Sequence, residues 1–373
     1  MLCEIEFLPV GEGSRAGDAI VVRYGDVNNY RLMVVDGGTA ESGENMVSHL
    51  RKHFGQSVTL SDVVLTHSDA DHASGLREIL QQIPVTNLWL HVPWWLSEEA
   101  ISLFKNKSWT REGLGAAIKK EYDIVSEIVD LAVLARCKIY YPFQGAQIGP
   151  FTVLSPSKWH YLYLLPQFDG TPDPDQSVIE SANMWLGKAQ TRLLKAIFER
   201  VAATVLNWVP ETWNGERLRD GGQTSASNES SVVLYADTGS ERVLLTGDAG
   251  VSALWWSIQY ARSRNFPLQA FSFVQIPHHG SRRNVGPSVL NELLGSIQPE
   301  GTNRFSAFVS APKDDDQHPR KIVLNAFMRR GGRVIATQGS SKIYWGGFPG
   351  RADYTTDRRS PSRHPLKTTI KYR

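Results

Sequence analysis

The chain has 373 residues, of which 41% are hydrophobic and 21% charged, and its formal net charge is +2. This is the composition of an ordinary globular protein that is long enough for a large core. The near-neutral charge gives no global field that would indicate nucleic-acid binding.

The two cysteines, Cys3 and Cys137, are too few for a disulfide framework or a thiolate metal site, and they fit a reducing compartment. No stretch is apolar for long enough to cross a bilayer. Residues 3–10 alternate like a strand and lack the features of a signal peptide. We therefore expect a cytoplasmic protein with no membrane partner.

The first ninety residues alternate between predicted strands and helices. Strands are expected at 4–10, 18–24, 31–35, 62–65 and 87–91, and helices at 45–54 and 74–83. A similar order returns later, with strands at 231–236, 242–245, 271–276, 307–309, 334–336 and 343–345 and helices at 251–262, 288–294 and 321–330. The two halves predict a duplicated α/β core.

The middle of the chain has a different pattern. It predicts long helices at 121–136 and 177–208, short strands at 138–141 and 151–154, and a Gly-rich connector at 213–225. We interpret residues from about 92 to 227 as a mainly helical insertion in a single domain, 1–350, with its core at 1–91 and 228–350. Residues 351–373 carry seven Lys or Arg and two Asp, which indicates either a tail that contacts phosphates or a solvated terminus.

Four side chains of the kinds that bind metals follow the strand at 62–65. They are His67, Asp69, Asp71 and His72. Two imidazoles and two carboxylates on one tight loop are costly to desolvate without a cation between them, although short His/Asp clusters also occur by chance on solvated loops. Two later strands end in Asp248 and in the pair His278 and His279. A metal site needs such distant contributions, because one loop cannot surround an ion.

In this order the motifs resemble the metallo-β-lactamase fold, and within it the soluble hydrolase domain of the competence protein ComEC. The usual loop HxHxDH reads here as residues 67–72, with Asp69 in place of the second His. Further matches are residues 17–20, 35–38, 228–232, 246–248, 278–281 and 318–319. The resemblance covers roughly 3–91 and 228–345 and implies an α/β fold, the αββα sandwich of two mixed sheets flanked by helices.

The resemblance also implies two divalent metal ions. His67 and Asp69 would hold the first ion, with Asn228 where other superfamily members have a third His. Because Asp69 and Asn228 make this site rich in oxygen, Mn²⁺ competes with Zn²⁺ there, and we expect either ion.

The second ion would be held by Asp71, His72 and one residue of the pair 278–279, with Asp248 bridging both ions. His279 is the favoured ligand. His278 would then serve proton transfer or substrate contact, or orient another side chain through a hydrogen bond. The expected catalytic residues are Asp71, Asp248 and His278.

We expect a hydrolase that uses a water activated by two metal ions, acting as a phosphodiesterase or nuclease on DNA or RNA. Arg282 and Arg283 could meet a phosphodiester or be an ordinary surface pair. Five tryptophans could stack on bases or simply pack the insertion: Trp94, Trp95, Trp109, Trp208 and Trp213. The alternatives are a small-molecule hydrolase, for a phosphoester, cyclic nucleotide, lactone or thioester, and a regulatory subunit with a vestigial site.

The connector at 216–222 looks exposed. Proteolysis there could release a latent effector of a bacterial defence system, which would make a regulatory protease or another defence protein a partner. The alternative is an ordinary flexible loop.

Overall fold

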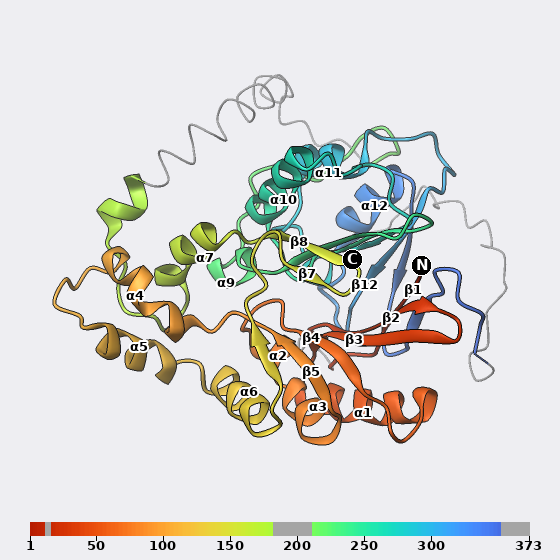
Figure 1. The fold of residues 1–373 in the computed structure, drawn as a ribbon. Helices are drawn as coiled ribbons and strands as arrows, with labels where there is room; N and C mark the ends of the chain where they lie inside the picture. The colour runs from red at the N-terminus through yellow and green to blue at the C-terminus, as the bar shows by residue number, and fades with distance from the viewer. Residues whose placement is uncertain (12–15, 182–210, 352–373) are drawn as a thin grey trace.

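Two seven-stranded sheets lie face to face, and helices cover both outer faces (Figure 1). The computed structural model describes residues 1–11, 16–181 and 211–351. Each sheet mixes parallel and antiparallel pairs. The predicted fold class, an αββα sandwich, is confirmed.

The first sheet is built mostly from the N-terminal part of the chain. Its strands are β1 (Leu2–Phe7), β2 (Ala19–Asp26), β3 (Asn29–Gly37), β4 (Leu60–Val64), β5 (Val85–Trp89), β6 (Lys138–Tyr140) and β14 (Lys342–Tyr344), in the order β14-β1-β2-β3-β4-β5-β6. Strands β3 to β6 are parallel, whereas β2 and β3 are antiparallel. The start of β2 therefore lies at the same edge of the sheet as the ends of β3 and β4.

The second sheet is built mostly from the C-terminal part. Its strands are β7 (Gln147–Ile148), β8 (Phe151–Ser155), β9 (Val233–Asp237), β10 (Arg242–Leu245), β11 (Phe273–Gln275), β12 (Phe305–Val309) and β13 (Gly332–Ala336), in the order β13-β12-β11-β10-β9-β8-β7. Strands β10 to β13 are parallel, so their carboxyl ends share one edge.

Both faces of the central strands are buried, which is why these strands read as continuous apolar runs in the sequence. Along β3, Leu32 and Val34 pack toward the helices, while Met33 and Val35 point into the layer between the sheets. Phe273 from β11 lies in that same inner layer. The alternation fixes the register of each strand, because a shift by one residue would exchange its two faces.

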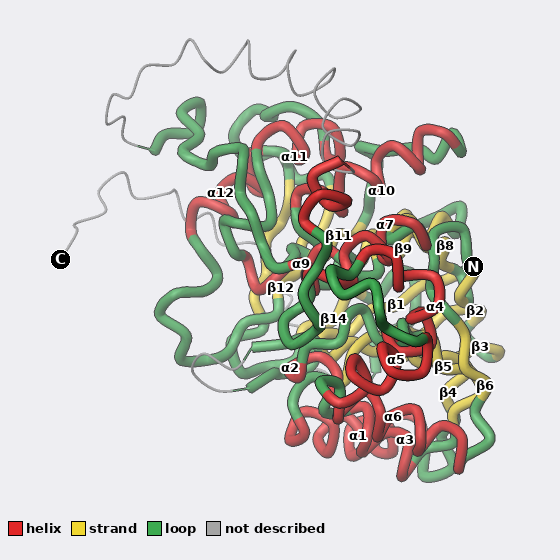
Figure 2. The backbone as a smooth tube through the Cα atoms, turned by 90° about the vertical axis from the view of Figure 1, so that its left-hand side faces the viewer, coloured by secondary structure: helices red, strands yellow, loops and turns green. Residues whose placement is uncertain are grey.

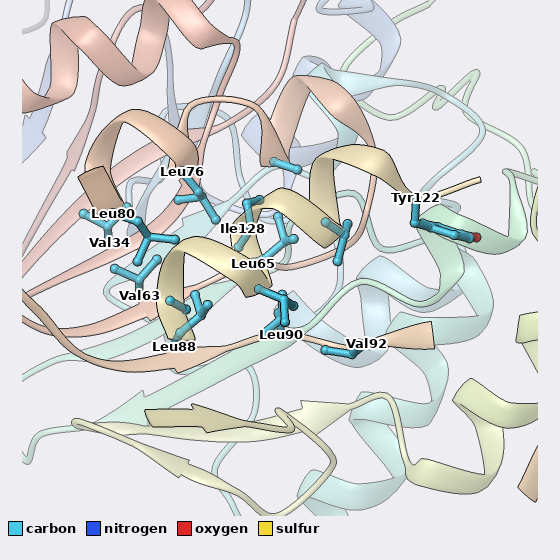
Figure 3. Close-up of a cluster of buried hydrophobic side chains, with 14 of the residues drawn as sticks. Val34, Val63, Leu65, Leu76, Leu80, Leu88, Leu90, Val92, Tyr122 and Ile128 are labelled. Atoms are coloured by element: carbon cyan, nitrogen blue, oxygen red, sulfur yellow. The ribbon is translucent and has the colours of Figure 1, made fainter. Parts of the chain in front are cut away.

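Helices cover each sheet on its outer side, and the two groups lie on opposite sides of the molecule (Figure 2). The first group is α1 (Ala40–Phe54), α3 (Leu76–Gln82) and α6 (Asp123–Leu134), and the second is α10 (Val251–Ser263), α11 (Pro287–Leu294) and α12 (Lys321–Arg329). Leu76 and Leu80 of α3 and Ile128 of α6 pack near Val34 and Val63 of the first sheet (Figure 3). The predicted helix at 74–83 is α3, and the short α2 (Ala70–Ala73) that precedes it was not predicted.

The stretch predicted as an insertion, 92–227, also supplies part of the core. Strands β6, β7 and β8 lie within it and extend the two sheets. The predicted helix at 121–136 begins later, as α6, after a separate α5 (Arg111–Lys120). The remaining described elements of this stretch are η1 (Pro93–Leu96), α4 (Ser97–Ala100), η2 (Ile101–Leu103), α7 (Lys158–Leu164), η3 (Leu165–Gln167) and α9 (Ala226–Glu229). Most of the predicted helix at 177–208, and the basic tail beyond residue 351, lie outside the described residues.

The connector after residue 210 is anchored to α12 and to the residue that follows it. Arg330 is fully buried and forms two hydrogen bonds of 2.9 and 3.0 Å with the carboxylate of Glu216. Leu218 is buried, and the carboxylate of Asp220 accepts hydrogen bonds from the backbone and hydroxyl of Ser288. The expectation that 216–222 is exposed is therefore wrong for most of this segment.

Within the described part of the chain, no helix combines the length and the apolar character that a membrane crossing requires.

We expect Glu216→Gln to destabilise the protein by about 3 kcal/mol, because it leaves the buried Arg330 charge without its counter-ion. The free energy of unfolding, measured by urea denaturation, checks this. A matched control is Glu292→Gln, which breaks the more exposed pair with Arg262 and should cost less than about 1 kcal/mol. Equal losses in the two variants would show that the connector does not depend on this ion pair.

Candidate metal centre

The predicted ligands come from loops at the facing edges of the two sheets. Residues 66–72 follow β4, residues 246–248 follow β10, and residues 277–281 follow β11. Because β4 is parallel to β3, and β10 is parallel to β11, their carboxyl ends open toward a common space. Active sites of α/β folds are typically built at such strand ends.

The carboxylate of Asp248 lies at the centre of this space. Its Oδ2 atom is 3.4 Å from Nε2 of His72, 3.9 Å from Nε2 of His67, and 3.8 Å from Nε2 of both His278 and His279. Two ligand atoms on one zinc ion, each about 2.1 Å from it, stand roughly 3–4 Å apart. The spacing around Asp248 is therefore that of side chains able to share metal ions.

Several polar atoms in the cluster are buried and have no hydrogen-bond partner among the described residues. They are Nε2 of His67, Nε2 of His72, Oδ1 of Asp248 and Oδ1 of Asn228. Buried polar atoms in folded proteins are nearly always paired, so an exception needs an explanation. A divalent cation supplies one, because these nitrogen and oxygen atoms are the ligands that Zn²⁺ and Mn²⁺ accept. The residues present thus fit the implied metal.

Asp36 fixes the orientation of the ligand loop. Its carboxylate accepts hydrogen bonds of 2.7 Å from the backbone N–H of Thr66 and 2.6 Å from the Thr66 hydroxyl. One of its oxygens also lies 2.8 Å from Nδ1 of His72, which turns Nε2 of that ring toward Asp248. A carboxylate behind a histidine is the usual way to orient a metal-binding imidazole. Asp36 has a positive φ of 58°, a strained conformation that such contacts maintain.

Three glycines hold the far end of the same loop against the sheet. A side chain at Gly75 would come within 2.0 Å of the carbonyl oxygen of Gly37, and one at Gly43 would come within 2.4 Å of the carbonyl oxygen of Gly75. The backbone N–H of Gly75 donates to the carbonyl oxygen of Gly38. Here the end of β3, the start of α1 and the start of α3 are in backbone contact, which no larger residue would permit.

In the metal-free protein, protons compensate the charge of Asp248. Burial opposes charging of His72, but the carboxylates of Asp248 and Asp36 outweigh it and hold the pKa of His72 well above its ordinary value. Burial likewise opposes ionisation of Asp248, yet the surrounding imidazoles, above all His72, hold the pKa of Asp248 well below its usual range. A metal ion would replace these protons, since it binds the neutral imidazole and the ionised carboxylate.

The two histidines after β11 differ in their surroundings. The side chain of His279 is 6% exposed, its Nδ1 lies 3.2 Å from the carbonyl oxygen of Ser310, and burial lowers its pKa to about 4. It forms a compact set with Asp71 and His72. The side chain of His278 is 29% exposed. Both residues have positive φ, 47° and 52°.

The side chains expected to complete the first site lie at the margin of the cluster. Asp69 is 42% exposed, and its Oδ2 is 3.5 Å from Nε2 of His67. Asn228 donates through Nδ2 to the Thr224 hydroxyl, and the same nitrogen lies 3.0 Å from Nδ1 of His278. Among the described residues, the compact sets of three or more ligand atoms contain Asp18, Asp36, His67, Asp71, His72, Asp248, His278 and His279 but not Asp69.

Asp18 belongs to the centre, although sequence reasoning used its motif only to place a strand. It is buried, accepts a 2.7 Å hydrogen bond from Nε2 of Gln275, and lies 4.0 Å from Nδ1 of His72. Burial, with the nearby carboxylates of Asp248 and Asp36, raises its pKa to about 7. The signal available in the sequence was an acidic residue directly before a strand that pairs with the strand ending in Asp36.

The aromatic residues singled out in the sequence are mostly packed. Trp94 is buried, and Trp213 donates its indole N–H to the carbonyl oxygen of Gln298. Trp95 is 49% exposed, and Trp208 lies outside the described residues.

Comparison with known proteins agrees with this architecture. Residues 13–132 match the family model of the Metallo-beta-lactamase superfamily. The chain has the metallo-β-lactamase fold. It is also similar to ComE operon protein 3 of Bacillus subtilis, at 28% identity over 122 residues, which span 32% of this chain and 14% of that protein.

Two solved structures are similar at low identity. One is Zn²⁺-bound PqqB from Methylobacterium extorquens, at 11% identity and a TM-score of 0.42, covering 91% of this chain and 99% of that one. The other is an archaeal metallo-beta-lactamase superfamily protein from Sulfolobus tokodaii, at 13% identity and a TM-score of 0.30, covering 78% of this chain and 84% of that one.

We expect Asp36→Asn to weaken zinc binding by roughly 10- to 100-fold, because the amide cannot accept from both Thr66 and His72 as the carboxylate does. Competition with a chromogenic chelator measures the affinity. Asp62→Asn is the matched control, since Asp62 is a buried carboxylate of the same sheet that accepts hydrogen bonds from Asn87 and Trp89 instead. Unchanged zinc affinity in Asp36→Asn would contradict the orienting role.

Proposed function

We propose that this protein is a metal-dependent hydrolase that cleaves phosphodiesters, with DNA or RNA as the leading substrates. The observation that carries the proposal is the convergence of buried, unpartnered ligand atoms around Asp248. His67 and Asp69 would hold one ion; Asp71, His72 and His279 would hold the other; and Asp248 would serve both. Bound divalent ions lower the pKa of water and offset the charge that develops on phosphoryl oxygens.

His278 is the residue best placed to handle a proton. Hydrolysis joins the oxygen of a water to phosphorus and breaks the bond to the leaving oxygen, which then takes up a proton. Nδ1 of His278 lies 2.9 Å from Oδ1 of Asn284 and 3.0 Å from Nδ2 of Asn228, so these two amides occupy the Nδ1 side of the ring and Nε2 is the nitrogen available to a substrate. That atom faces Asp248 on a partly exposed side chain and can exchange a proton with substrate.

The oxygen donors at Asp69 and Asn228 support a phosphodiester over a carbonyl substrate. They replace imidazoles that would make the ion a stronger Lewis acid, and a weaker one is better suited to activating water than to polarising a carbonyl. Arg282 and Arg283 follow the histidine pair and are exposed, where guanidinium groups can bind phosphate oxygens.

The test is hydrolysis of single- and double-stranded DNA, RNA and bis(p-nitrophenyl) phosphate by protein loaded with Zn²⁺ or Mn²⁺. We expect cleavage by the natural protein and at least a roughly 1000-fold loss in the double variant Asp71→Ala with His72→Ala. A matched control changes the same residue types away from the centre, as Asp26→Ala with His53→Ala, and should retain activity. Failure of both metal-loaded forms to cleave any of these substrates would refute the proposal.

We further expect Asp69→His, which restores the HxHxDH pattern, to shift metal preference toward zinc by roughly tenfold relative to manganese. Imidazole is a softer ligand than carboxylate, and the substituted position lies at the partly exposed margin of the cluster, so the change should not disturb the core. Affinities for the two ions, measured by competition, give the ratio. An unchanged ratio would indicate that residue 69 does not contact the ion.

A small-molecule hydrolase is the second candidate. It is favoured by a pocket beside Asp69, which suits a compact group better than a continuous strand.

A further inference from the structure

A cavity of about 610 Å³ lies directly beside the metal centre. Its walls are residues 68–70 of the ligand loop, 121–125 at the junction of α5 and α6, 167–169 after α7, and 225–227 at the start of α9. Pockets of roughly 300–1,000 Å³ hold molecules of the size of a nucleoside or a drug.

The cavity is continuous with the centre through one side chain. Asp69, which faces Nε2 of His67 across 3.5 Å, is part of the cavity wall, and so is Ser227, whose hydroxyl donates to Asp69. A group in the cavity would therefore be attached to the reacting phosphorus by only a short link. The chemical class of ligand that this cavity can bind is determined by the charge and polarity of its remaining walls.

The charge of those walls has one sign. Glu121, Asp123 and Asp169 line the cavity and are exposed, and among the residues that the structure describes no Lys or Arg lines it. Buried Tyr122 and Phe168 contribute aromatic surface between them. Three carboxylates repel an anion at this range even through solvent, while an uncharged ring or an ammonium group meets no such penalty.

We propose that this cavity binds the uncharged or cationic group on one side of the scissile phosphodiester and rejects an anionic group there. The inference rests on the proposed function and sharpens it. A nucleic acid would be used from an end that carries a free hydroxyl, with one terminal nucleoside in the cavity, because an uninterrupted strand would place a further phosphate among the three carboxylates. The polyanionic remainder would lie outside the cavity, whose lining does not include the exposed Arg282 and Arg283.

The test measures binding to metal-loaded protein by calorimetry, so it does not depend on turnover. The ligands are dithymidine with a phosphorothioate linkage, which slows hydrolysis, and the same compound with an added 5′- or 3′-terminal phosphate. We expect at least one terminal phosphate to weaken binding roughly tenfold. The variant Glu121→Gln with Asp123→Asn and Asp169→Asn should abolish that difference.

A control variant, Glu41→Gln with Glu44→Gln and Asp130→Asn, makes the same change in net charge at exposed positions outside the cavity. It should keep the discrimination. The inference is overturned if neither terminal phosphate weakens binding, or if the difference is the same in the cavity variant as in the natural protein. Binding with this discrimination but no cleavage of any phosphodiester would instead refute the proposed function and leave the selectivity of the cavity intact.

Discussion

The arrangement of the metal centre depends on one buried negative charge, that of Asp248, which needs positive charge beside it. Asp248 lies 3% exposed among four imidazoles, where an isolated carboxylate would be too costly to keep ionised. Protons on the histidines can balance the negative charge of Asp248, and metal ions can do the same. The neighbouring side chains orient the imidazoles and carboxylates that would bind either the protons or the ions. Asp36 orients one imidazole, the carbonyl of Ser310 orients another, and Gln275 holds Asp18 in the same network.

This requirement also explains the two-sheet arrangement. The imidazole and carboxylate groups come from loops that are about 180 to 210 residues apart in sequence, and the sandwich brings them together because parallel strands in each sheet end at the edge they share. Of the seven non-glycine residues with positive φ in the described chain, Asp36, His278 and His279 belong to this centre. Strain of this kind persists only where the surrounding packing enforces it.

Much of this arrangement could be predicted from the sequence. The strand at 242–245 was placed at its observed bounds, and α12 was placed to within one residue, because both combine an apolar pattern with clear turn signals. The strand expected at 138–141 is β6, but its place at the edge of the first sheet depends on its pairing with β5, and β7, with two residues, has no periodicity to recognise. The role of Asp18 depends on the pairing of β2 with β3. The burial of the connector depends on Arg330, more than a hundred residues later.

The backbone contact among Gly37, Gly43 and Gly75 constrains the part of the chain beside the metal ligands, but not the part that forms the opposite wall of the cavity. It leaves no room for a side chain at these three positions, so the segment that follows His72 is fixed against β3 and α1 by the core itself. The opposite wall of the cavity is supplied by the middle of the chain, at 121–125 and 167–169, whose exposed carboxylates are under no such constraint. Selection for a new substrate could therefore substitute the residues of that wall without changing the metal ligands beside it.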